Sequence, residues 1–175
     1  MRKNTLLFIL VTCIVSNLNS QKKFSNRKID NLKNQVQQLV EEDKKMTQVM
    51  IDKVFSFGEL GFQEFETSKY MGAILEENGF DVEYQVSNIP TSWLATWSNG
   101  EGGPVIALGS DFDGVPSTSQ YPGVAYEKPV VEGAPGHGEG HNIGLPIVVT
   151  SALSLKKIMI ENNINGTLLI WPGVA

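Results

Sequence analysis

The chain reads VIALGSDFDG at residues 105–114, a short apolar run that Gly109 and Ser110 separate from two acidic residues, Asp111 and Asp113. A continuous apolar run of this length, Val105–Leu108, is typical of a β-strand that is covered on both faces. Open α/β sheets bind their ligands beyond the carboxyl ends of the strands. Asp111 and Asp113 therefore follow the strand at the position where such a fold carries its chemistry.

The sequence on either side of this strand predicts helices and strands in alternation. Hydrophobic periodicity and turn residues predict these elements in chain order: a long or broken helix over residues 26–57, a helix over 67–78, strands over 81–86, 91–97 and 105–108, a helix over 143–161 and a strand over 167–171. Gly79 directly follows the second helix and is expected to end it. This order predicts an α/β fold with a parallel or mixed sheet.

Composition and charge limit the class of protein. The chain has 175 residues, of which 41% are hydrophobic and 19% charged, an ordinary composition for one globular domain that excludes a disordered chain, collagen and a coiled coil. From Met46 onward, five basic residues stand against fifteen acidic ones. Nucleic-acid binding needs a basic surface, so we expect no nucleic-acid partner and favour a protein that binds cations.

The first twenty residues have the pattern of an export signal. Arg2-Lys3 forms a positive start, and Leu6–Val15 forms an apolar core that is too short to span a bilayer. We therefore expect a signal peptide over residues 1–20, a mature chain over residues 21–175 with no stable membrane span, and a periplasmic or secreted location. Cys13 is the only cysteine and fits a lipoprotein signal poorly. The mature chain would then contain neither a disulfide nor a thiolate ligand.

The long segment 109–146 carries the candidate site. It is rich in glycine and proline, and it contains both histidines of the chain within Gly136-His137-Gly138-Glu139-Gly140-His141-Asn142. A loop of this length is unusual in a compact domain unless it has a function. Imidazole and carboxylate groups are ligands of Zn²⁺, Mn²⁺ and Co²⁺, and glycines let a backbone fold closely around an ion. The segment predicts metal binding, with a solvated Gly-rich surface loop as the alternative.

Four other motifs fit this segment less well. His137 and His141 have the spacing of a zincin helix, but the glycines between them disfavour a helix and no glutamate directly follows His137. Asp111 and Asp113 lack the remaining ligands of an EF-hand loop. The glycines do not form a dinucleotide fingerprint after a strand. Residues for a Ser-His-Asp triad exist, but the sequence of a nucleophile elbow does not.

Three stretches, in order and at compatible spacing, resemble motifs of the M20 family of metal-dependent amidohydrolases and peptidases. They are FGELGFQE (57–64) with the helix that follows, SDFDGVP (110–116), which is similar to the D-M-D-A-L-P segment, and GAPGHGEGHN (133–142), which is similar to the G-x-C-G-H-D/N metal loop. The branch concerned includes hippurate, auxin-conjugate and aminobenzoyl-glutamate hydrolases. The resemblance runs from about residue 45 to the last residue.

The resemblance assigns roles to residues of the loop. It implies two divalent cations, Zn²⁺, Mn²⁺ or Co²⁺, with His141 as a metal ligand. Glu139 stands where this branch has a bridging cysteine, and we expect the glutamate to act as a metal ligand there. Asp113 would assist catalysis by orienting a ligand, whereas Asp111 could be a ligand, a contact to a ligand or a helix-capping acid. His137 matches a histidine that the family does not usually use as a ligand.

The resemblance also implies a fold and an activity. The chain matches the N-terminal part of a three-layer α/β/α catalytic domain with a mixed sheet. The family's general-base glutamate, its later histidine ligands and its inserted dimerisation domain would fall beyond Ala175. The complete protein is expected to hydrolyse amide bonds of N-acyl amino acids or peptides and to form a homodimer through that domain, whereas these 175 residues alone are expected to be inactive.

Two alternatives to an exported amidohydrolase stay open at this point. The first is a non-catalytic metal-binding pseudo-enzyme of the same ancestry, which Glu139 in place of the cysteine favours. The second is an exported binding module whose loop recognises a partner. Glutamates and histidines encoded beyond residue 175 would favour the amidohydrolase, and a stop codon there would favour the pseudo-enzyme.

Overall fold

The computed structural model describes residues 24–174. The expected signal peptide, residues 1–20, lies outside the described residues. The chain divides into two compact units, of which the first ends at Asn31 and the second begins at Leu32. Of the described residues, the first unit contributes only the start of one helix, so the sheet and the candidate site belong entirely to the second.

Four α-helices form close to where the sequence predicts them. The helix expected over 26–57 is broken at Asp43 into α2 (Asn26–Glu42) and α3 (Lys44–Phe57), while α4 spans Phe65–Glu77 and α5 spans His141–Glu161. Gly58 and Gly79 follow α3 and α4 with φ values of +54° and +76°, a conformation that glycine adopts readily. Helix α5 begins two residues earlier than expected, which places His141 in its first turn.

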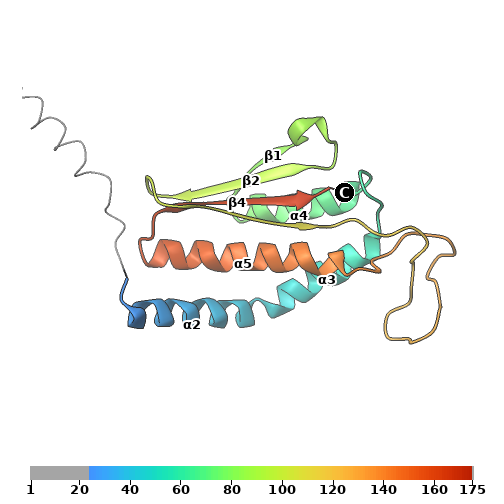
Figure 1. The fold of residues 1–175 in the computed structure, drawn as a ribbon, viewed down its shortest axis with the longest axis horizontal. Coiled ribbons are helices and arrows are strands. Elements are labelled where there is room, and N and C mark those ends of the chain that lie inside the picture. Colours follow the sequence, from blue (N-terminus) through green and yellow to red (C-terminus); the bar gives the residue numbers. More distant parts are fainter. Residues whose placement is uncertain (1–23, 175) are drawn as a thin grey trace, which may run out of the picture. The chain divides into compact units, whose positions relative to one another are not determined.

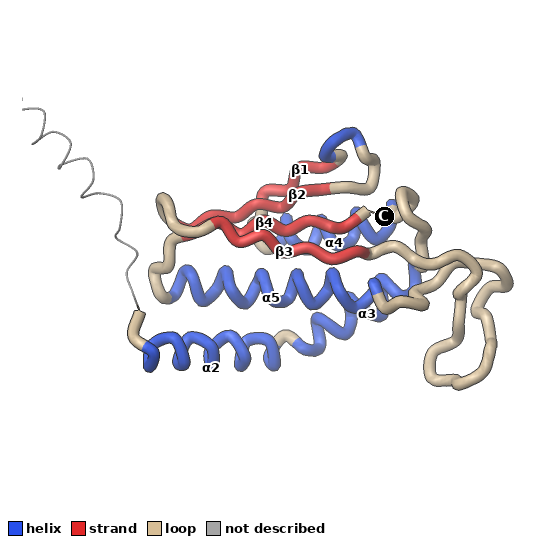
Figure 2. Tube along the Cα trace, viewed as in Figure 1, coloured by secondary structure: helices blue, strands red, loops and turns tan. Residues whose placement is uncertain are grey.

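The strands form a four-stranded mixed sheet (Figure 2). They are β1 (Asp81–Tyr84), β2 (Trp93–Asn99), β3 (Val105–Asp111) and β4 (Gly166–Gly173), in the order β1-β2-β4-β3. β2 pairs antiparallel with β1 and β4, and β3 pairs parallel with β4. The predicted α/β class is therefore confirmed, with a mixed sheet. β3 runs three residues further than predicted, because Ser110 and Asp111 pair with Pro172 and Gly173 of β4.

The hydrophobic core lies between the sheet and helices α3, α4 and α5 (Figure 1). Alternate residues of β4, Leu168 and Ile170, are fully buried, as are Leu145 and Val149 of α5. They form one cluster with apolar residues of α3, α4 and β2, among them Met50, Val54, Met71, Leu75, Trp93 and Ala95. Burial of apolar area contributes about 25 cal/mol per Å², so this cluster is what fixes α5 against β3 and β4.

β3 is an edge strand in the described part of the chain, which differs from the expected strand covered on both faces. Val105 is 63% exposed, and Ile106 and Ala107 are exposed as well. The reason is that β3 has a single neighbouring strand, β4, and packs against α5 on one side. Residues 24–174 thus form a sheet with its helices on one face, and the three-layer arrangement stays a prediction.

Helix α5 is long and apolar enough to cross a membrane, with a mean hydropathy of 1.6 over its apolar window. Leu145, Val149 and Ala152 on this helix are nevertheless fully buried in the core. Part of the apolar surface of α5 is therefore buried in the core of the described residues.

Candidate metal site

The carboxyl end of β3 brings two acidic side chains to the start of the long loop. Asp111 is the last residue of the strand, and its side chain is about half exposed. Phe112 is fully buried in the core and anchors the chain between the two acids. Asp113 follows with a largely buried side chain that contacts the first residue of α5. The topology therefore places the two acids beside the N-terminal end of α5.

The loop that follows is tied to the FGELGFQE segment and to itself. The Gly114 N–H donates to the Glu59 carbonyl oxygen, and Val115 pairs with Gly136 in a short antiparallel bridge. The Thr118 hydroxyl lies 2.8 Å from the carbonyl oxygens of both Val115 and Gly136. A Cβ on Gly136 would lie 2.6 Å from the Thr118 carbonyl oxygen, so this approach requires a glycine. These contacts hold the histidine-containing end of the loop beside the end of β3.

His141 stands at the start of α5 with its imidazole held by Asp113. Its Nδ1 lies 2.8 Å from Asp113 Oδ1, the length of a charge-assisted hydrogen bond in which Nδ1–H donates to the carboxylate. A proton held on Nδ1 leaves Nε2 with a free lone pair on the other side of the ring. Histidine ligands of metals are commonly oriented in this way, by a carboxylate on the second ring nitrogen.

Two further carboxylates face the Nε2 atom of His141. Glu139 Oε2 lies 3.5 Å from Nε2 and Asp111 Oδ2 lies 3.9 Å from it, and the two side chains are 66% and 52% exposed. Two donors at about 2.0–2.2 Å from one tetrahedral ion are separated by about 3.4 Å. The separation of His141 and Glu139 therefore fits a shared divalent cation. Imidazole nitrogen with carboxylate oxygen is a donor set that suits Zn²⁺, Mn²⁺ or Co²⁺.

These residues build only part of a metal site. Among residues 24–174, no group of three or more His, Cys, Asp or Glu side chains has the geometry of a complete site. His141 and Asp113 are mostly buried, with side chains 25% and 17% exposed, whereas the two other acids face solvent. The arrangement thus offers one oriented imidazole, His141. The solvent-facing Glu139 carboxylate lies close enough to share one ion with it, and the Asp111 carboxylate lies nearby.

His137 has a structural contact instead. Its Nε2 lies 3.0 Å from the Val54 carbonyl oxygen, in the last turn of α3, and its Nδ1 is buried without a hydrogen-bond partner. Burial lowers the pKa of His137, which favours a neutral imidazole whose Nε2–H donates to that carbonyl. Carbonyl groups at a helix end need such partners, so His137 fastens the loop to α3.

Glu59, in the FGELGFQE segment, caps the start of α4. Its carboxylate accepts hydrogen bonds from the backbone N–H groups of Glu66 and Thr67, both at 2.9 Å, and from the Thr67 hydroxyl at 2.8 Å. A negative charge at a helix N-terminus satisfies free N–H groups and interacts favourably with the helix dipole. Glu59, the first acid of the motif, therefore has a structural role.

Glu64, the last residue of that segment, is completely buried, a feature that the sequence reasoning missed. The Thr91 hydroxyl donates to its Oε2 at 2.8 Å, and its Oε1 is buried without a hydrogen-bond partner. Burial raises the pKa of Glu64, and the carboxylate of Asp113 adds to the shift. Its place in the motif is the one signal that singles it out, because the spacing of the apolar residues gives no sign of a buried acid.

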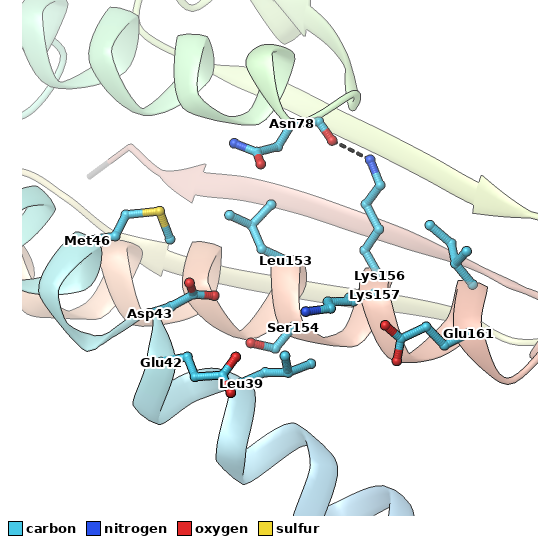
Figure 3. Close-up of a pocket in the computed structure, with 11 residues that line it drawn as sticks. Leu39, Glu42, Asp43, Met46, Asn78, Leu153, Ser154, Lys156, Lys157 and Glu161 are labelled. Atoms are coloured by element: carbon cyan, nitrogen blue, oxygen red, sulfur yellow. Dashed lines mark hydrogen bonds between the residues drawn. The ribbon is translucent and has the colours of Figure 1, made fainter.

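A hollow whose lining includes none of the candidate metal ligands lies along α5 (Figure 3). It has a volume of about 410 Å³, with walls from the end of α2, the start of α3 and the second half of α5. Lys156 reaches from α5 to the Asn78 carbonyl oxygen at the end of α4, and its amine lies 5.4 Å and 5.3 Å from the ring centres of Phe80 and Trp97. Burial lowers the pKa of Lys156. A cation at a helix C-terminus is stabilising, so this lysine stabilises the end of α4.

Several known proteins resemble the chain in sequence or fold. The chain is 32% identical over 136 residues to one of the subunits of p-aminobenzoyl-glutamate hydrolase from Escherichia coli (strain K12). Its fold matches a predicted aminohydrolase from methicillin-resistant Staphylococcus aureus with a TM-score of 0.63 at 21% identity. It also matches a dinuclear metal-binding peptidase of the M20 family from Bacillus subtilis with a TM-score of 0.53 at 24% identity. No family model matches the chain.

The chain spans only part of these proteins. The sequence match covers 77% of the chain and 28% of the Escherichia coli protein. The structural matches cover 81% and 76% of the chain, but 35% and 36% of the Staphylococcus aureus and Bacillus subtilis structures. The sequence relationship rests on the 136 matched residues, and the two structures show similarity of the fold alone.

Proposed function

Because the chain belongs to the M20 family of metal-dependent peptidases and amidohydrolases, we propose that its residues form the N-terminal part of the catalytic domain of an enzyme that hydrolyses amide bonds in N-acyl amino acids or peptides. One observation carries the proposal above the others: His141 in the GEGHN loop has its Nδ1 on Asp113 and its Nε2 toward Glu139. These are the residues to which the family resemblance gives metal-related roles.

Each of the three residues has a distinct part in this proposal. His141 Nε2 and the Glu139 carboxylate would hold a divalent cation, Zn²⁺, Mn²⁺ or Co²⁺. Asp113 would keep the proton on Nδ1 of His141, so that Nε2 stays a lone-pair donor. When bound, such a cation acts as a Lewis acid toward the substrate's amide carbonyl. Asp111, 3.9 Å from Nε2, is the nearest further carboxylate.

Glu139 in place of a cysteine changes the chemistry expected of the site. A glutamate has two oxygens and can bridge two cations, and we propose that it does so in the complete enzyme. Carboxylate oxygen is a harder donor than thiolate sulfur, so the site should favour Mn²⁺ and Zn²⁺ and lose the preference for soft ions that a thiolate confers. Its two-thirds exposure leaves the side chain free to reach either cation.

A non-catalytic metal-binding domain is the second candidate, and the same substitution at Glu139 favours it. The two candidates share the metal site and differ in turnover by the complete protein. We also propose that the protein is exported to the periplasm or secreted, which rests on the Arg2-Lys3 start and the apolar run that follows.

Isothermal titration of the 175-residue chain with Mn²⁺ and Zn²⁺ tests the metal site. His141→Ala and Glu139→Ala should each weaken binding about tenfold or more, because each removes one of two protein ligands. His137→Ala is the matched histidine control and should have the smaller effect on affinity once the fraction of folded protein is measured by circular dichroism. Equal losses at His137 and His141 would overturn the ligand assignment, as would a wild-type chain that binds neither ion.

A further inference from the structure

Helix α2 carries an apolar stripe that the described residues leave largely uncovered. The next helix, α3, buries Met50 and Val54 in the core, whereas no residue of α2 is buried. No apolar residue of α2 belongs to the core cluster or packs against it. Leu39, at the end of α2, lines the hollow drawn in Figure 3, so this end of the stripe borders open space. Within residues 24–174, the stripe therefore has no closely packed partner.

The apolar residues of α2 have the spacing of helices that pair with one another. Ile29, Leu32, Val36 and Leu39 are three, four and three positions apart, which are the a and d positions of a heptad. A helix that packs on a protein core usually has a wider stripe, whereas this narrow seam is typical of a helix that packs along a second helix. All other residues of α2 except Val40 are polar or charged. The seam thus favours another helix as the partner.

The charges of α2 are divided between its two ends. Residues 26–33 contain three bases and one acid, whereas the only charged residues in the rest of the helix are Glu41 and Glu42. Two copies of such a helix attract each other when they lie antiparallel, because the basic end of each meets the acidic end of the other. The polar side is mostly Asn and Gln, unlike the Lys- and Arg-rich side of a helix that binds a membrane surface.

An antiparallel pair of α2 helices has a register in which every seam residue meets another. With the two-fold axis beside Asn34, Ile29 lies opposite Leu39 of the second copy, and Leu32 lies opposite Val36 of the second copy. Each contact occurs twice, because a two-fold interface uses the same surface of both copies. The register therefore covers the whole seam of both helices.

The residues that flank the seam select the same direction. Lys28 and Glu42 occupy equivalent g positions of the heptad, and the antiparallel register places Lys28 opposite Glu42 of the second copy, twice by symmetry. Within the described residues, neither of the two forms an ion pair. A parallel pair would instead place Lys28 opposite Lys33 of the second copy. In the antiparallel pair, the two Lys33 residues meet near the axis, which is its single unfavourable contact.

We infer that α2 is a dimerisation helix, which pairs antiparallel with α2 of a second copy of this chain. This interface goes beyond the proposed function, because it needs no metal. It also differs from the dimer that the family resemblance implies, which would form through the inserted domain. Two heptads fall short of the three or four that a coiled coil needs. The dimer should therefore be weak, with a Kd of about 10–100 µM, at the low end of specific interfaces.

Sedimentation equilibrium of the 175-residue chain, at concentrations below and above this Kd and with a reductant present, tests the interface. Val36→Asp should weaken dimerisation tenfold or more, because it places a charge in the seam of each copy. Val49→Asp is the matched control, since it makes the same change at a valine of α3 that is 49% exposed, and it should change the Kd less than twofold. Circular dichroism checks that both variants are folded. Added Mn²⁺ should leave the Kd unchanged.

Charge exchange tests the direction of the pair. Lys28→Glu and Glu42→Lys should each weaken the dimer threefold or more at low salt, and the chain that carries both changes should return to within twofold of the wild type. The two positions are fourteen residues apart on one helix, so only a contact between copies can produce this rescue. In a parallel pair, Lys28→Glu would tighten the dimer instead, because it would face Lys33 of the second copy.

Four results would overturn the inference. They are a chain that stays monomeric over the whole concentration range, equal effects of the two valine variants, tighter association of Lys28→Glu, and no rescue by the double charge exchange. A dimer that forms through the exposed edge of β3 would give the second result. Vesicles of phosphatidylglycerol provide the last comparison: a monomeric chain that binds them, and loses this binding in Val36→Asp but not in Val49→Asp, would assign the stripe to a membrane surface.

Discussion

Replacing Glu64 with glutamine should stabilise the protein by an amount that grows with pH. The Glu64 carboxyl is completely buried, the Thr91 hydroxyl donates to one of its oxygens, and the other oxygen has no partner. Burial raises its pKa above the ordinary value of 4.5, so the folded state holds the proton more tightly than the unfolded state. Glutamine has nearly the same shape, can still accept from Thr91 and never carries the charge.

The sign and size of the effect follow from linkage. The stability that the protonated carboxyl contributes is complete below pH 4.5 and is lost as the pH rises through the raised folded-state pKa. One proton that differs between the two states changes the free energy of unfolding by about 1.4 kcal/mol per pH unit. The advantage of Glu64→Gln should therefore appear near pH 4.5, rise at up to this slope and level off above the folded-state pKa.

Urea unfolding between pH 4 and pH 8, followed by tryptophan fluorescence, to which the buried Trp93 contributes, measures this difference directly. Titrating groups that do not interact with Glu64 contribute equally to the wild type and the variant, so they cancel. Glu66→Gln, which replaces an exposed glutamate two residues away, is the control and should show no such rise. A difference between Glu64→Gln and wild type that is constant over this range, or that falls with pH, would refute the reasoning.

Four further outcomes are expected. Asp113→Asn should weaken Mn²⁺ or Zn²⁺ binding about 10–100-fold in isothermal titration, because it removes the carboxylate 2.8 Å from His141 Nδ1. Asp111→Asn, which alters a half-exposed carboxylate 3.9 Å from Nε2, should cost less than about threefold, and the reverse order would exchange the two roles. Glu59→Gln should lower the free energy of unfolding by about 1–2 kcal/mol, since three donors at the start of α4 lose a charged acceptor; an unchanged urea midpoint would contradict the cap. With added Mn²⁺ or Zn²⁺, the 175-residue chain should hydrolyse no N-acyl amino acid detectably, because the family resemblance assigns the general base to no residue of this chain, and general acid–base help is worth about 10²–10⁴-fold. Metal-dependent turnover in that assay would show that the base lies within these residues.

Local patterns predicted most of the fold, because apolar residues recur at helical spacing in α3 and α4 and turn residues separate the elements. Helix α4 begins and ends within two residues of its predicted bounds, and Gly79 follows it as predicted. The first helix, which the sequence predicts as either long or broken, is broken at Asp43. The exposure of β3 could not be foreseen, since an apolar run such as Val105–Leu108 indicates a strand but not how many neighbours the strand has.

The candidate site was also predictable only in part from the sequence. The meeting of Asp113, Glu139 and His141 follows from motifs whose positions could be read in the sequence. The roles of His137 and Glu64 depend on burial and on partners far along the chain: His137 contacts Val54, which is 83 positions away. Spacing within a motif carries no information about such contacts, and only the folded chain reveals them.

The place of β4 in the sheet has a consequence for the order of folding. β4 is the last of the described strands in sequence, yet it lies between β2 and β3 and pairs with both. Until residues 166–173 insert, these two strands have no partner on their facing edges, and pairs such as Ala95 with Ile170 must form across a long stretch of chain. Such non-local pairing is slow and leaves strand edges open to aggregation. The register also sets Gly173 opposite Asp111, so the strand that completes the sheet is also the one that fixes the end of β3 where the candidate ligands gather.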